Sequence, residues 1–558
     1  MKVVDLLAKI LVNEVKDNQS PLLYKLVKEA LLYNNPNFEK NKILIIAFLE
    51  YIWTIGKWIY YDVLDILKGK SVGCVGSDPP SKIRLSKFLS PLEFLAIYYP
   101  KRNIRLMAYK LSKKLDINIT QVCNYTCQYC YQRSRDGNWR VRLKELQNKE
   151  LTSEDLKKIL YNAKSLGVKR VKITGGEPLI KGDITLNALK LAYELGFEEV
   201  ELVTNGYMLG KYVKDLHKFA GSGERFHLHT SIDAISYSKG LNKFSYFHFE
   251  KLRENLEMLR RMMPQSKISV NTMWTKFFID NDDWKEMYDF FKRIKITHWT
   301  ISFPYIVEEI VATLKEDVHF IPPYEVIVEK ARQIYLYHIS EGKPFMLSMP
   351  LIVKDELLFD FHIPKIEKDC HPCFPCHGSF FIIGPEGDTF DCLLTSYTKV
   401  NIKNFSTLLE AAIAGVEQNT FYQIKISDVN PQCKSCRYEN ICMGQCVNDR
   451  VNANGAFNSR DKTACSLLVL SEIKLWPYLD KQIQNKIKSL LNFSGFVPSV
   501  YFSLYDVVTK APPITNDFYP SYRGIKSFLT KDELVVSPYM CKFKNLQWAY
   551  PPNSHFAT

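Results

Sequence analysis

Long uninterrupted apolar runs are absent from this chain of 558 residues. Residues 43–61 come nearest, but Glu50 and Lys57 cut them below the roughly 18 apolar residues that a membrane span needs. Asp5 and Lys9 interrupt the N-terminal stretch in the same way, so it lacks the apolar core of a signal peptide. We therefore expect no membrane span and a cytoplasmic location.

Internal repeats, low-complexity tracts and basic blocks with interleaved aromatics are also absent. The formal net charge of +14 would suit an anionic partner, but the lysines are spread over expected helix faces. We therefore expect a basic, solvated surface and no nucleic-acid partner. With 46% hydrophobic and 13% aromatic residues the chain can bury sizeable cores, and its length suggests three or four units of about 150 residues each.

The 14 cysteines are clustered along the chain. In a reducing cytoplasm, and in a chain too long to need covalent staples, they do not indicate a disulfide framework. Cys74 and Cys541 stand alone and are expected to be buried small hydrophobic residues. The other cysteines form three groups: Cys123, Cys127 and Cys130; Cys370, Cys373, Cys376 and Cys392; and Cys433, Cys436, Cys442, Cys446 and Cys465.

The first group has the spacing C-x3-C-x2-C within CNYTCQYCYQ, residues 123–132. Three thiolates can bind three corners of a cubane 4Fe–4S cluster and leave one iron open to a small molecule. A zinc site would need a fourth ligand nearby, and residues 114–150 contain no histidine and no further cysteine. The spacing therefore favours a reactive iron–sulfur cluster.

Strand-like and helical patterns alternate from about residue 112 to residue 307. Six strands are expected, in KLDINIT, VKRVKIT, EEVELVTNG, RFHLHTSIDA, KISVNTMWT and THWTISFPY. Right-handed helical crossovers would make them a parallel, barrel-like sheet. The cysteine loop follows the first strand, residues 175–178 follow the second, and Asn205 follows the third, so these turns should face one cavity.

These segments resemble the radical SAM enzymes. The family signature joins C-x3-C-x2-C to an aromatic residue before the last cysteine and a Gly-Gly-Glu-Pro motif one βα unit later. The matching residues here, beyond the three cysteines, are Tyr129, Gly175, Gly176, Glu177 and Pro178. The resemblance implies an α/β fold with a partial (β/α)6 TIM-like barrel. It also implies that S-adenosylmethionine binds the open iron and is cleaved to a 5'-deoxyadenosyl radical, with electrons from a flavodoxin- or ferredoxin-type donor.

The resemblance assigns the Gly-Gly-Glu-Pro motif to the methionine amino group, and glycines without a Cβ allow close approach of the backbone. By their place at strand ends, Asn205, Ser231 and Asp233 are candidates for ribose or carboxylate contacts. A polar residue at a strand end is equally typical of a simple turn, so both readings of these three stay open.

The later cysteines resemble the SPASM domain of radical SAM proteins, which carries two auxiliary 4Fe–4S clusters. The third group reads C-x2-C-x5-C-x3-C, and Cys465 follows after 18 more residues. In SFFIIGPEGDTFDC, residues 379–392, Gly387 turns the chain so that Cys376 and Cys392 return to the same end. A structural zinc ribbon is the alternative for the third group.

The resemblance also implies the ligands of the two auxiliary clusters. Those of the first are Cys370, Cys376, Cys392 and Cys446, and those of the second are Cys433, Cys436, Cys442 and Cys465. Cys373 is an alternative to Cys370. Four thiolates per cluster leave no open iron, so both clusters are expected to accept electrons and to staple the domain.

SPASM enzymes commonly oxidise or cross-link peptide residues, so we expect an oxidoreductase of the ribosomal-peptide maturase type with a peptide or protein substrate. One alternative is an anaerobic sulfatase-maturing enzyme, where an aspartate follows the hairpin cysteine as proton acceptor. Here Leu393 follows Cys392, and the candidate base is Asp391. A small-molecule or cofactor dehydrogenase is a further alternative. A non-catalytic iron–sulfur electron carrier is disfavoured, because it has no use for a pocket that binds S-adenosylmethionine.

The resemblance covers roughly residues 112 to 470. The expected organisation is a helix-rich extension over 1–111, the radical SAM partial barrel over 112–307, a bridging region over 308–369, the SPASM domain over 370–470 and a C-terminal extension over 471–558. The terminal extensions are expected to shape access of the substrate.

Overall fold

A computed structural model of the chain describes much of the region between residues 90 and 509. The described residues are 90–98, 102–125, 127–130, 139–146, 149–235, 246–280, 283–306, 308–350, 352–354, 381–390, 400–418, 431–442, 449 and 460–509. The chain divides into two compact units, Met1–Ser112 and Lys113–Thr558. Helix α4 (Pro91–Tyr98) lies in the first unit, and α5 (Arg102–Lys113) ends at the boundary.

A ten-stranded sheet forms the centre of the second unit, in the order β10-β9-β1-β2-β3-β4-β5-β6-β7-β8. Neighbouring strands from β1 to β7 are parallel. Their bounds are β1 Lys114–Asn118, β2 Arg170–Thr174, β3 Glu199–Val203, β4 Phe226–Ser231, β5 Lys267–Met273, β6 His298–Ser302 and β7 Met346–Met349. All six strands expected from the sequence are present, and the predicted partial barrel of the α/β class is confirmed.

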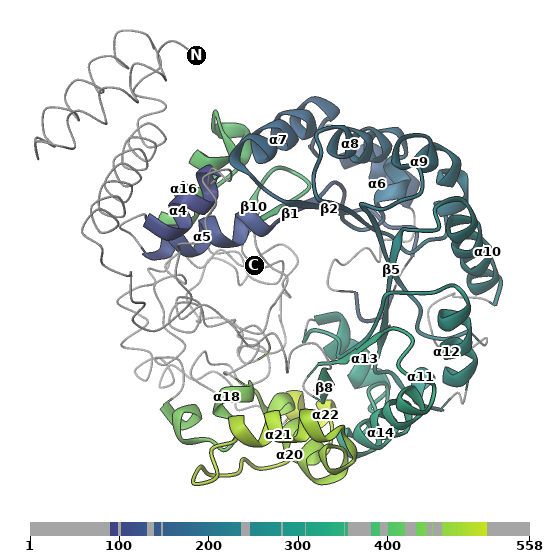
Figure 1. Ribbon diagram of the computed structural model, residues 1–558, viewed down its shortest axis with the longest axis vertical. Coiled ribbons are helices and arrows are strands. Elements are labelled where there is room, and N and C mark those ends of the chain that lie inside the picture. Colours follow the sequence, from purple (N-terminus) through teal and green to yellow (C-terminus); the bar gives the residue numbers. More distant parts are fainter. Residues whose placement is uncertain are drawn as a thin grey trace, which may run out of the picture. The chain divides into compact units, whose positions relative to one another are not determined.

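Helices cover the outer, convex face of the curved sheet (Figure 1). In chain order they are α7 Ser153–Leu166, α8 Asp183–Glu194, α9 Val213–Ala220, α10 Tyr246–Met262, α11 Lys276–Asp280, α12 Trp284–Arg293 and α14 Tyr324–Ser340. Helix α13 (Glu308–Glu316) instead contacts the cysteine loop, where Thr313 Oγ1 donates to Gln128 O at 3.2 Å. Local chemistry sets the ends of α7: Thr152 and Asp155 form a capping box, and Gly167 ends the helix at φ 87°. The crossover helices therefore start and stop at signals in their own sequence.

The two faces of β1 to β4 differ in polarity. Alternate side chains of a strand point to opposite faces. One set is apolar and fully buried, and comprises Leu115, Ile117, Val171, Ile173, Val200, Leu202, Phe226 and Leu228. The other set is polar, and comprises Lys114, Asp116, Asn118, Arg170, Lys172, Thr174, Glu199, Glu201, His227 and His229. The apolar set packs under the helices, so the polar set lines the concave face.

Short strands extend the sheet at both edges. At one edge β9 (Ile382–Ile383) runs parallel to β1 and pairs with β10 (Thr389–Phe390) in a hairpin. Gly387 lies in its turn at φ 100°, and a Cβ there would lie 2.8 Å from Asn401 Oδ1. At the other edge β8 (Val353–Lys354) pairs with β7. The turn expected at Gly387 is therefore present.

The remaining helices follow the hairpin. They are α16 Leu408–Gln418, α18 Glu439–Cys442, α20 Lys462–Lys474, α21 Lys481–Leu490 and α22 Leu504–Thr509. Helix α20 packs on α14, where the hydroxyls of Tyr324 and Thr463 lie 2.9 Å apart. Among the described helices, none has the length and apolar character that a membrane crossing requires. Residues 43–61 lie outside the described residues.

Candidate active site

The loops after β1 and β2 lie against each other at the C-terminal edge of the sheet. Gly176 N donates to Thr120 O at 2.8 Å, and Glu177 N donates to Val122 O at 2.8 Å. These bonds continue the pairing of β1 and β2 beyond the strands themselves. The sheet thus places the cysteine loop directly beside the Gly-Gly-Glu-Pro loop.

Both glycines of the motif are required by this contact. A Cβ on Gly175, which has φ 149°, would lie 2.5 Å from Thr120 O. A Cβ on Gly176 would lie 2.3 Å from Val122 O. Real Cβ atoms do not approach backbone oxygen so closely, so only glycine fits. The close approach that the structure shows is to the backbone of the cysteine loop.

Cys123, Cys127 and Cys130 form no disulfide, and their thiols lie close enough to influence one another electrostatically. Cys130 N donates to Cys127 O at 3.1 Å, and Tyr125 N donates to Cys123 Sγ at 3.4 Å. Burial raises the pKa of Cys127 well above its usual value, and the nearby sulfurs of Cys130 and Cys123 raise it further. Three unbridged thiols that oppose one another's ionisation are a donor set that a cationic metal cluster would stabilise.

The side chain of Glu177 is buried inside the protein. It accepts hydrogen bonds from Leu179 N at 3.0 Å, from Thr204 Oγ1 at 2.7 Å and from Asn205 N at 2.7 Å. Burial raises its pKa to about 7, although these donors act in the opposite direction. Glu177 therefore braces the loop after β2 against the loop after β3.

Asn205 links the loop after β3 to the cysteine loop. Its Nδ2 donates to Asn124 Oδ1 at 2.8 Å and lies 3.8 Å from Cys123 Sγ. Its Oδ1 accepts from Tyr207 N at 3.1 Å. The structure thus brings Asn205 to the thiol group.

Asp233 and Ser231, at the end of β4, differ in their surroundings. Asp233 accepts a hydrogen bond from the Tyr129 hydroxyl and another from Met273 N at 2.8 Å. Burial raises the pKa of Asp233 to about 6, against the effect of these two donors. Asp233 therefore joins the cysteine loop to β4 and β5, whereas Ser231 is exposed at the strand end.

Glu150 and Lys181 are two further residues of this region that no sequence motif marks. Their buried side chains form an ion pair at 2.8 Å. Glu150 also accepts from Thr120 Oγ1 at 3.0 Å and from Gln121 N at 2.9 Å. The pair fixes the start of the cysteine loop to the segment that follows Pro178. An isolated glutamate in a loop carries no pattern from which this role could be predicted.

The later cysteines are described in part. Burial raises the pKa of Cys465, and Asp461, Cys433 and Cys436 raise it further, so these cysteines are neighbours. Cys436 N donates to Cys433 O at 3.2 Å, and Cys442 ends α18. The other members of the predicted sets lie outside the described residues; they are Cys370, Cys373, Cys376, Asp391, Cys392 and Cys446.

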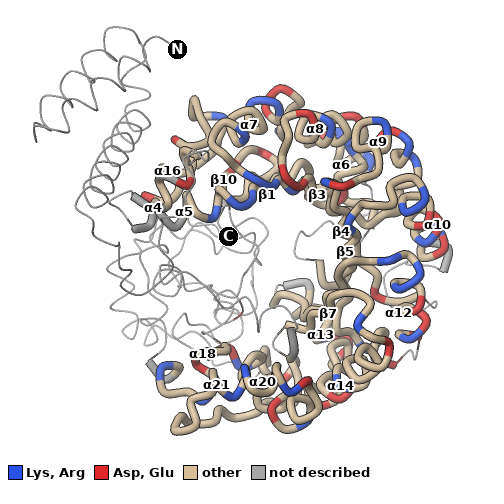
Figure 2. Tube along the Cα trace, in the orientation of Figure 1, with Lys and Arg blue, Asp and Glu red and all other residues tan. Residues whose placement is uncertain are grey.

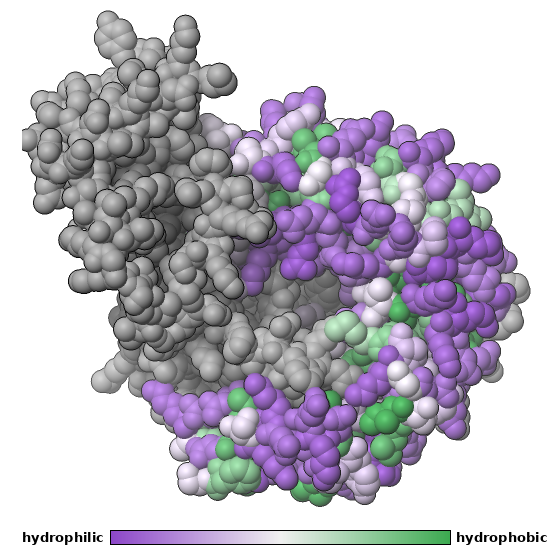
Figure 3. Space-filling model, viewed as in Figure 1, coloured by the Kyte–Doolittle hydropathy of each residue, from purple (hydrophilic) through white to green (hydrophobic). Residues whose placement is uncertain are grey.

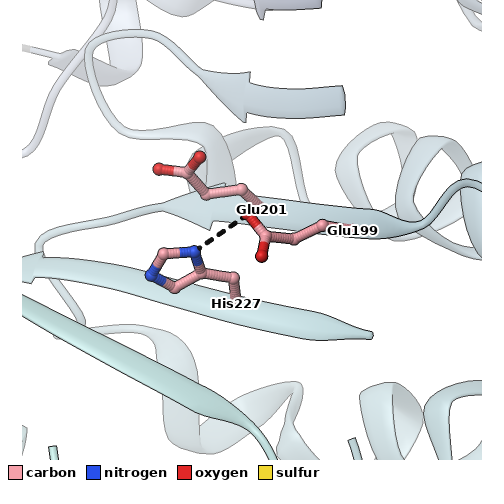
Figure 4. A group of neighbouring side chains, drawn as sticks. All are labelled: Glu199, Glu201 and His227. Atoms are coloured by element: carbon pink, nitrogen blue, oxygen red, sulfur yellow. Dashed lines mark hydrogen bonds and ion pairs between the residues drawn. The ribbon is translucent and has the colours of Figure 1, made fainter. Parts of the chain in front are cut away.

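Another group with metal-ligand character lies on the concave face, where Glu199, Glu201 and His227 offer donor atoms within 4.8 Å of one another (Figure 4). Both carboxylates are already paired with lysines, Glu199 with Lys267 at 2.6 Å and Glu201 with Lys114 at 2.5 Å. A cation would have to displace these ammonium groups, so the group is a poor metal site.

Residues 117–291 match the model of the Radical SAM superfamily. The matched segment contains the three gathered cysteines, the Gly-Gly-Glu-Pro motif and strands β2 to β5. This part of the chain is a radical SAM domain.

Two curated relatives are similar over part of this chain. An S-adenosylmethionine-dependent nucleotide dehydratase of Fibrobacter sp. (strain UWH6) is 28% identical over 196 residues, which are 33% of this chain and 53% of that protein. A GTP 3',8-cyclase of Staphylococcus aureus (strain Mu3) is 35% identical over 123 residues, which are 22% of this chain and 34% of that protein. The chain thus matches about half the length of the first and a third of the second.

Among solved structures, the fold is similar to SuiB of Streptococcus suis, determined with its precursor peptide SuiA. The two chains are 19% identical, with a TM-score of 0.46 over 74% of this chain and 89% of that chain.

Proposed function

We propose that this chain, which contains a radical SAM domain, is an oxidoreductase that modifies a peptide or protein substrate. The observation that carries the radical chemistry is the proximity of three cysteine thiols to the Gly-Gly-Glu-Pro loop at the C-terminal edge of the sheet. Cys123, Cys127 and Cys130 would hold a 4Fe–4S cluster through three of its irons. When bound, the cluster and S-adenosylmethionine would supply the radical chemistry that removes a hydrogen atom from the substrate.

The chain's own residues would hold this edge rigid. Glu177 ties the second loop to the third, and the Glu150–Lys181 pair ties the first loop to the second. Asp233 holds the Tyr129 ring beside the thiols. Precise placement of reacting groups requires such supporting contacts, because small displacements reduce rates strongly.

The peptide substrate and the auxiliary clusters rest on the SPASM-like cysteine pattern. Cys433, Cys436 and Cys465 are neighbours, which supports one auxiliary cluster completed by Cys442. The first auxiliary cluster would use Cys370 or Cys373 with Cys376, Cys392 and Cys446. In a two-electron oxidation the first electron would leave the substrate with the abstracted hydrogen atom, and these clusters would be available to accept the second. A flavodoxin- or ferredoxin-type donor would supply the separate electron that cleaves S-adenosylmethionine.

Anaerobic reconstitution tests both parts of this proposal. Three clusters predict about twelve irons per chain, and reduced protein with S-adenosylmethionine should release 5'-deoxyadenosine. Saturation near four irons, with zinc bound in the later cysteines, would contradict the SPASM-like assignment. A failure to release 5'-deoxyadenosine would instead indicate an iron–sulfur electron carrier.

A nucleotide substrate is the second candidate. Both curated relatives described above are named for reactions of nucleotides, and their similarity is confined to at most 33% of this chain. Incubation with GTP and S-adenosylmethionine, followed by mass spectrometry of the nucleotide, would reveal this activity. The side chains on the concave face bear on the choice between the two candidates.

A further inference from the structure

The concave face of the sheet carries a belt of alternating charges. We call six side chains from β1, β2, β3 and β5 the charged belt: Lys114, Asp116, Lys172, Glu199, Glu201 and Lys267. Figure 2 shows basic and acidic positions along the inner edge formed by β1 and β3. Lys114, Lys172 and Lys267 are matched by an equal number of carboxylates. Arg170 lies on the same face at the exposed end of β2.

The six charges of the belt are paired with one another. Lys114 Nζ lies 2.5 Å from Glu201 Oε2, and Lys267 Nζ lies 2.6 Å from Glu199 Oε2. Each of these pairs passes over an intervening strand, which suits the concave side of a curved sheet, where side chains converge. Lys172 pairs with Asp116 on the adjacent strand. Every lysine of the belt is therefore neutralised by a carboxylate.

The belt's two glutamates stay ionised despite their burial. Burial alone would raise the pKa of Glu199, but hydrogen bonds from His227 and Lys267 outweigh it and lower the pKa to about 2. For Glu201, burial is outweighed by Lys114 and by His229, and the pKa falls well below its usual range. The belt therefore carries no net charge at neutral pH.

Two side chains of β1, Asn118 and the belt residue Asp116, have buried polar atoms without a hydrogen-bond partner in the described residues. Asn118, on the polar face of β1, is 1% exposed. Neither its Oδ1 nor its Nδ2, nor Asp116 Oδ1, has a hydrogen-bond partner in the part of the chain that the structure describes. Buried polar atoms are costly unless they are paired, so these atoms indicate a ligand with both donors and acceptors.

Solvent reaches this face of the sheet. The side chain of His229 is 33% exposed and that of Lys172 is 20% exposed. Figure 3 shows hydrophilic residues along the upper border of the central hollow. Solvent therefore reaches this face at His229 and at Lys172, the register partner of Asp116, whereas Asp116 and Asn118 themselves are 3% and 1% exposed.

We propose that Asn118 and Asp116, on the concave face, pair with the amide groups of a peptide substrate, and that the charged belt excludes polyphosphates. This inference rests on the proposed function and names the substrate class of the same site. A peptide unit presents one N–H and one C=O, which match the carboxamide of Asn118. Within the belt, a polyphosphate would meet three carboxylates beside the three lysines and would find no surplus of positive charge. Selective sites use such repulsion against the wrong ligand.

Binding of GTP to the reconstituted holoenzyme tests the exclusion of polyphosphate. Wild-type protein should show no saturable GTP binding at millimolar concentration. The double variant Glu199→Gln, Glu201→Gln leaves Lys114 and Lys267 without counter-charges. Its affinity for GTP should be at least about tenfold above that of wild type, because two ammonium groups become available to phosphate.

Two matched control variants distinguish an effect of the charged belt from an effect of the protein's total net charge. Lys114→Met with Glu201→Gln removes one whole pair, keeps the belt neutral and should gain no GTP binding. Glu194→Gln with Glu254→Gln makes the same change in net charge on exposed positions of α8 and α10. It too should gain nothing. Asp116→Asn, which frees Lys172, provides a second belt variant if the double variant does not fold.

Saturable binding of GTP to wild type, weakened by Lys114→Met, would overturn the inference and identify the face as a nucleotide site. Belt variants that fold and gain no more than the surface control would also overturn it. These measurements need no turnover. If the protein binds GTP and also forms 5'-deoxyadenosine, only this inference is contradicted. If it binds no GTP and forms no 5'-deoxyadenosine, only the proposed radical chemistry is contradicted.

The role of Asn118 in peptide binding is tested with a pool of capped random hexapeptides. The pool should raise the melting temperature of wild-type holoenzyme, and the rise should be smaller for Asn118→Leu, which is similar in size but has no amide. Equal shifts in the two proteins, or no shift in wild type, would overturn the role of Asn118.

Discussion

Two sets of buried carboxylates on one sheet behave in opposite ways. At the C-terminal edge, burial raises the pKa of Glu177 to about 7 and that of Asp233 to about 6. On the concave face, the pKa of Glu199 falls to about 2 and that of Glu201 falls well below its usual range. Burial disfavours ionisation at all four positions. The difference lies in the partners, which are hydroxyl and backbone N–H groups at the edge but lysines and histidines on the concave face.

This contrast matches the chemistry proposed for each region. The edge keeps acids that are stabilised by neutral donors, and a cationic cofactor beside them would be favoured electrostatically. The concave face cancels its own charges, so it offers little to a polyanion and more to a ligand that forms hydrogen bonds. Glu150 is the exception at the edge, because its partner is Lys181.

The largest expected effect concerns the thiols of the edge. Changing Cys123, Cys127 and Cys130 together to Ala should reduce 5'-deoxyadenosine formation to background, because no site remains for the open cluster. About eight irons should stay bound elsewhere in the chain. The control is Cys541→Ala, a cysteine that stands alone in the sequence. Cleavage of S-adenosylmethionine that survives the triple change would place the radical chemistry outside the edge.

Breaking the ion pair between Glu150 and Lys181 should have the next largest effect. Glu150→Gln leaves the Lys181 ammonium buried without a counter-charge, so the free energy of unfolding should fall by about 3–5 kcal/mol. Urea denaturation measures this change. Lys181→Met added to Glu150→Gln should restore part of the loss, since the uncompensated charge is then gone. Lys190→Met, which breaks an exposed pair on α8, should change the free energy by less than about 1 kcal/mol.

The pH dependence of stability should have opposite signs in the two regions. Glu177 has a raised pKa, so its contribution is present below pH 4.5 and is lost as the pH rises through about 7. A shift of this size corresponds to about 3 kcal/mol. Glu199 has a lowered pKa, so its contribution is present above pH 4.5 and is lost as the pH falls towards 2.

The variants Glu177→Gln and Glu199→Gln isolate the two slopes. Free energies of unfolding measured from about pH 2 to pH 8 should show that Glu177→Gln removes a loss of stability as the pH rises from 4.5 through about 7. Glu199→Gln should remove a gain that develops between about pH 2 and pH 4.5 and is complete above pH 4.5. Slopes of the same sign for the two residues would contradict the contrast between the regions.

The smallest expected effect concerns the close contact between the Gly-Gly-Glu-Pro loop and the cysteine loop. Gly176→Ala places a Cβ 2.3 Å from Val122 O, a backbone atom that cannot move without shifting the cysteine loop. We expect a loss of about 1–3 kcal/mol in stability and a lower content of the open cluster, measured by iron analysis. Gly342→Ala meets no atom within 4 Å at φ 74°, so it reports backbone strain alone. Unchanged iron content in Gly176→Ala would show that the loops tolerate separation.

The sequence by itself determined the six strands from β1 to β6, one crossover helix in each interval between them (α7, α8, α9, α10 and α12) and the three loops that follow β1, β2 and β3. It did not indicate the short helices α6 (Trp139–Leu146) and α11. Periodicity, helix caps and glycines act within a few residues, so they can be recognised in the sequence alone. The sequence did not reveal β7, because Met346–Met349 is only four residues long and has little periodic pattern. The helices α13 and α14 lie in what the sequence suggested was a bridging region.

Only the tertiary structure decided which charges meet. Lys114 and Glu201 are 87 positions apart in sequence, and they pair because β1 and β3 converge on the concave face. In the sequence, Glu177 belongs to a motif expected to bind a cofactor. In the structure, its carboxylate accepts hydrogen bonds from Thr204 and Asn205 and so connects the protein's own loops. Alternation predicts which face of a strand a side chain occupies. The partner on that face, and with it the sign of each pKa shift, follows from the curvature and register of the sheet.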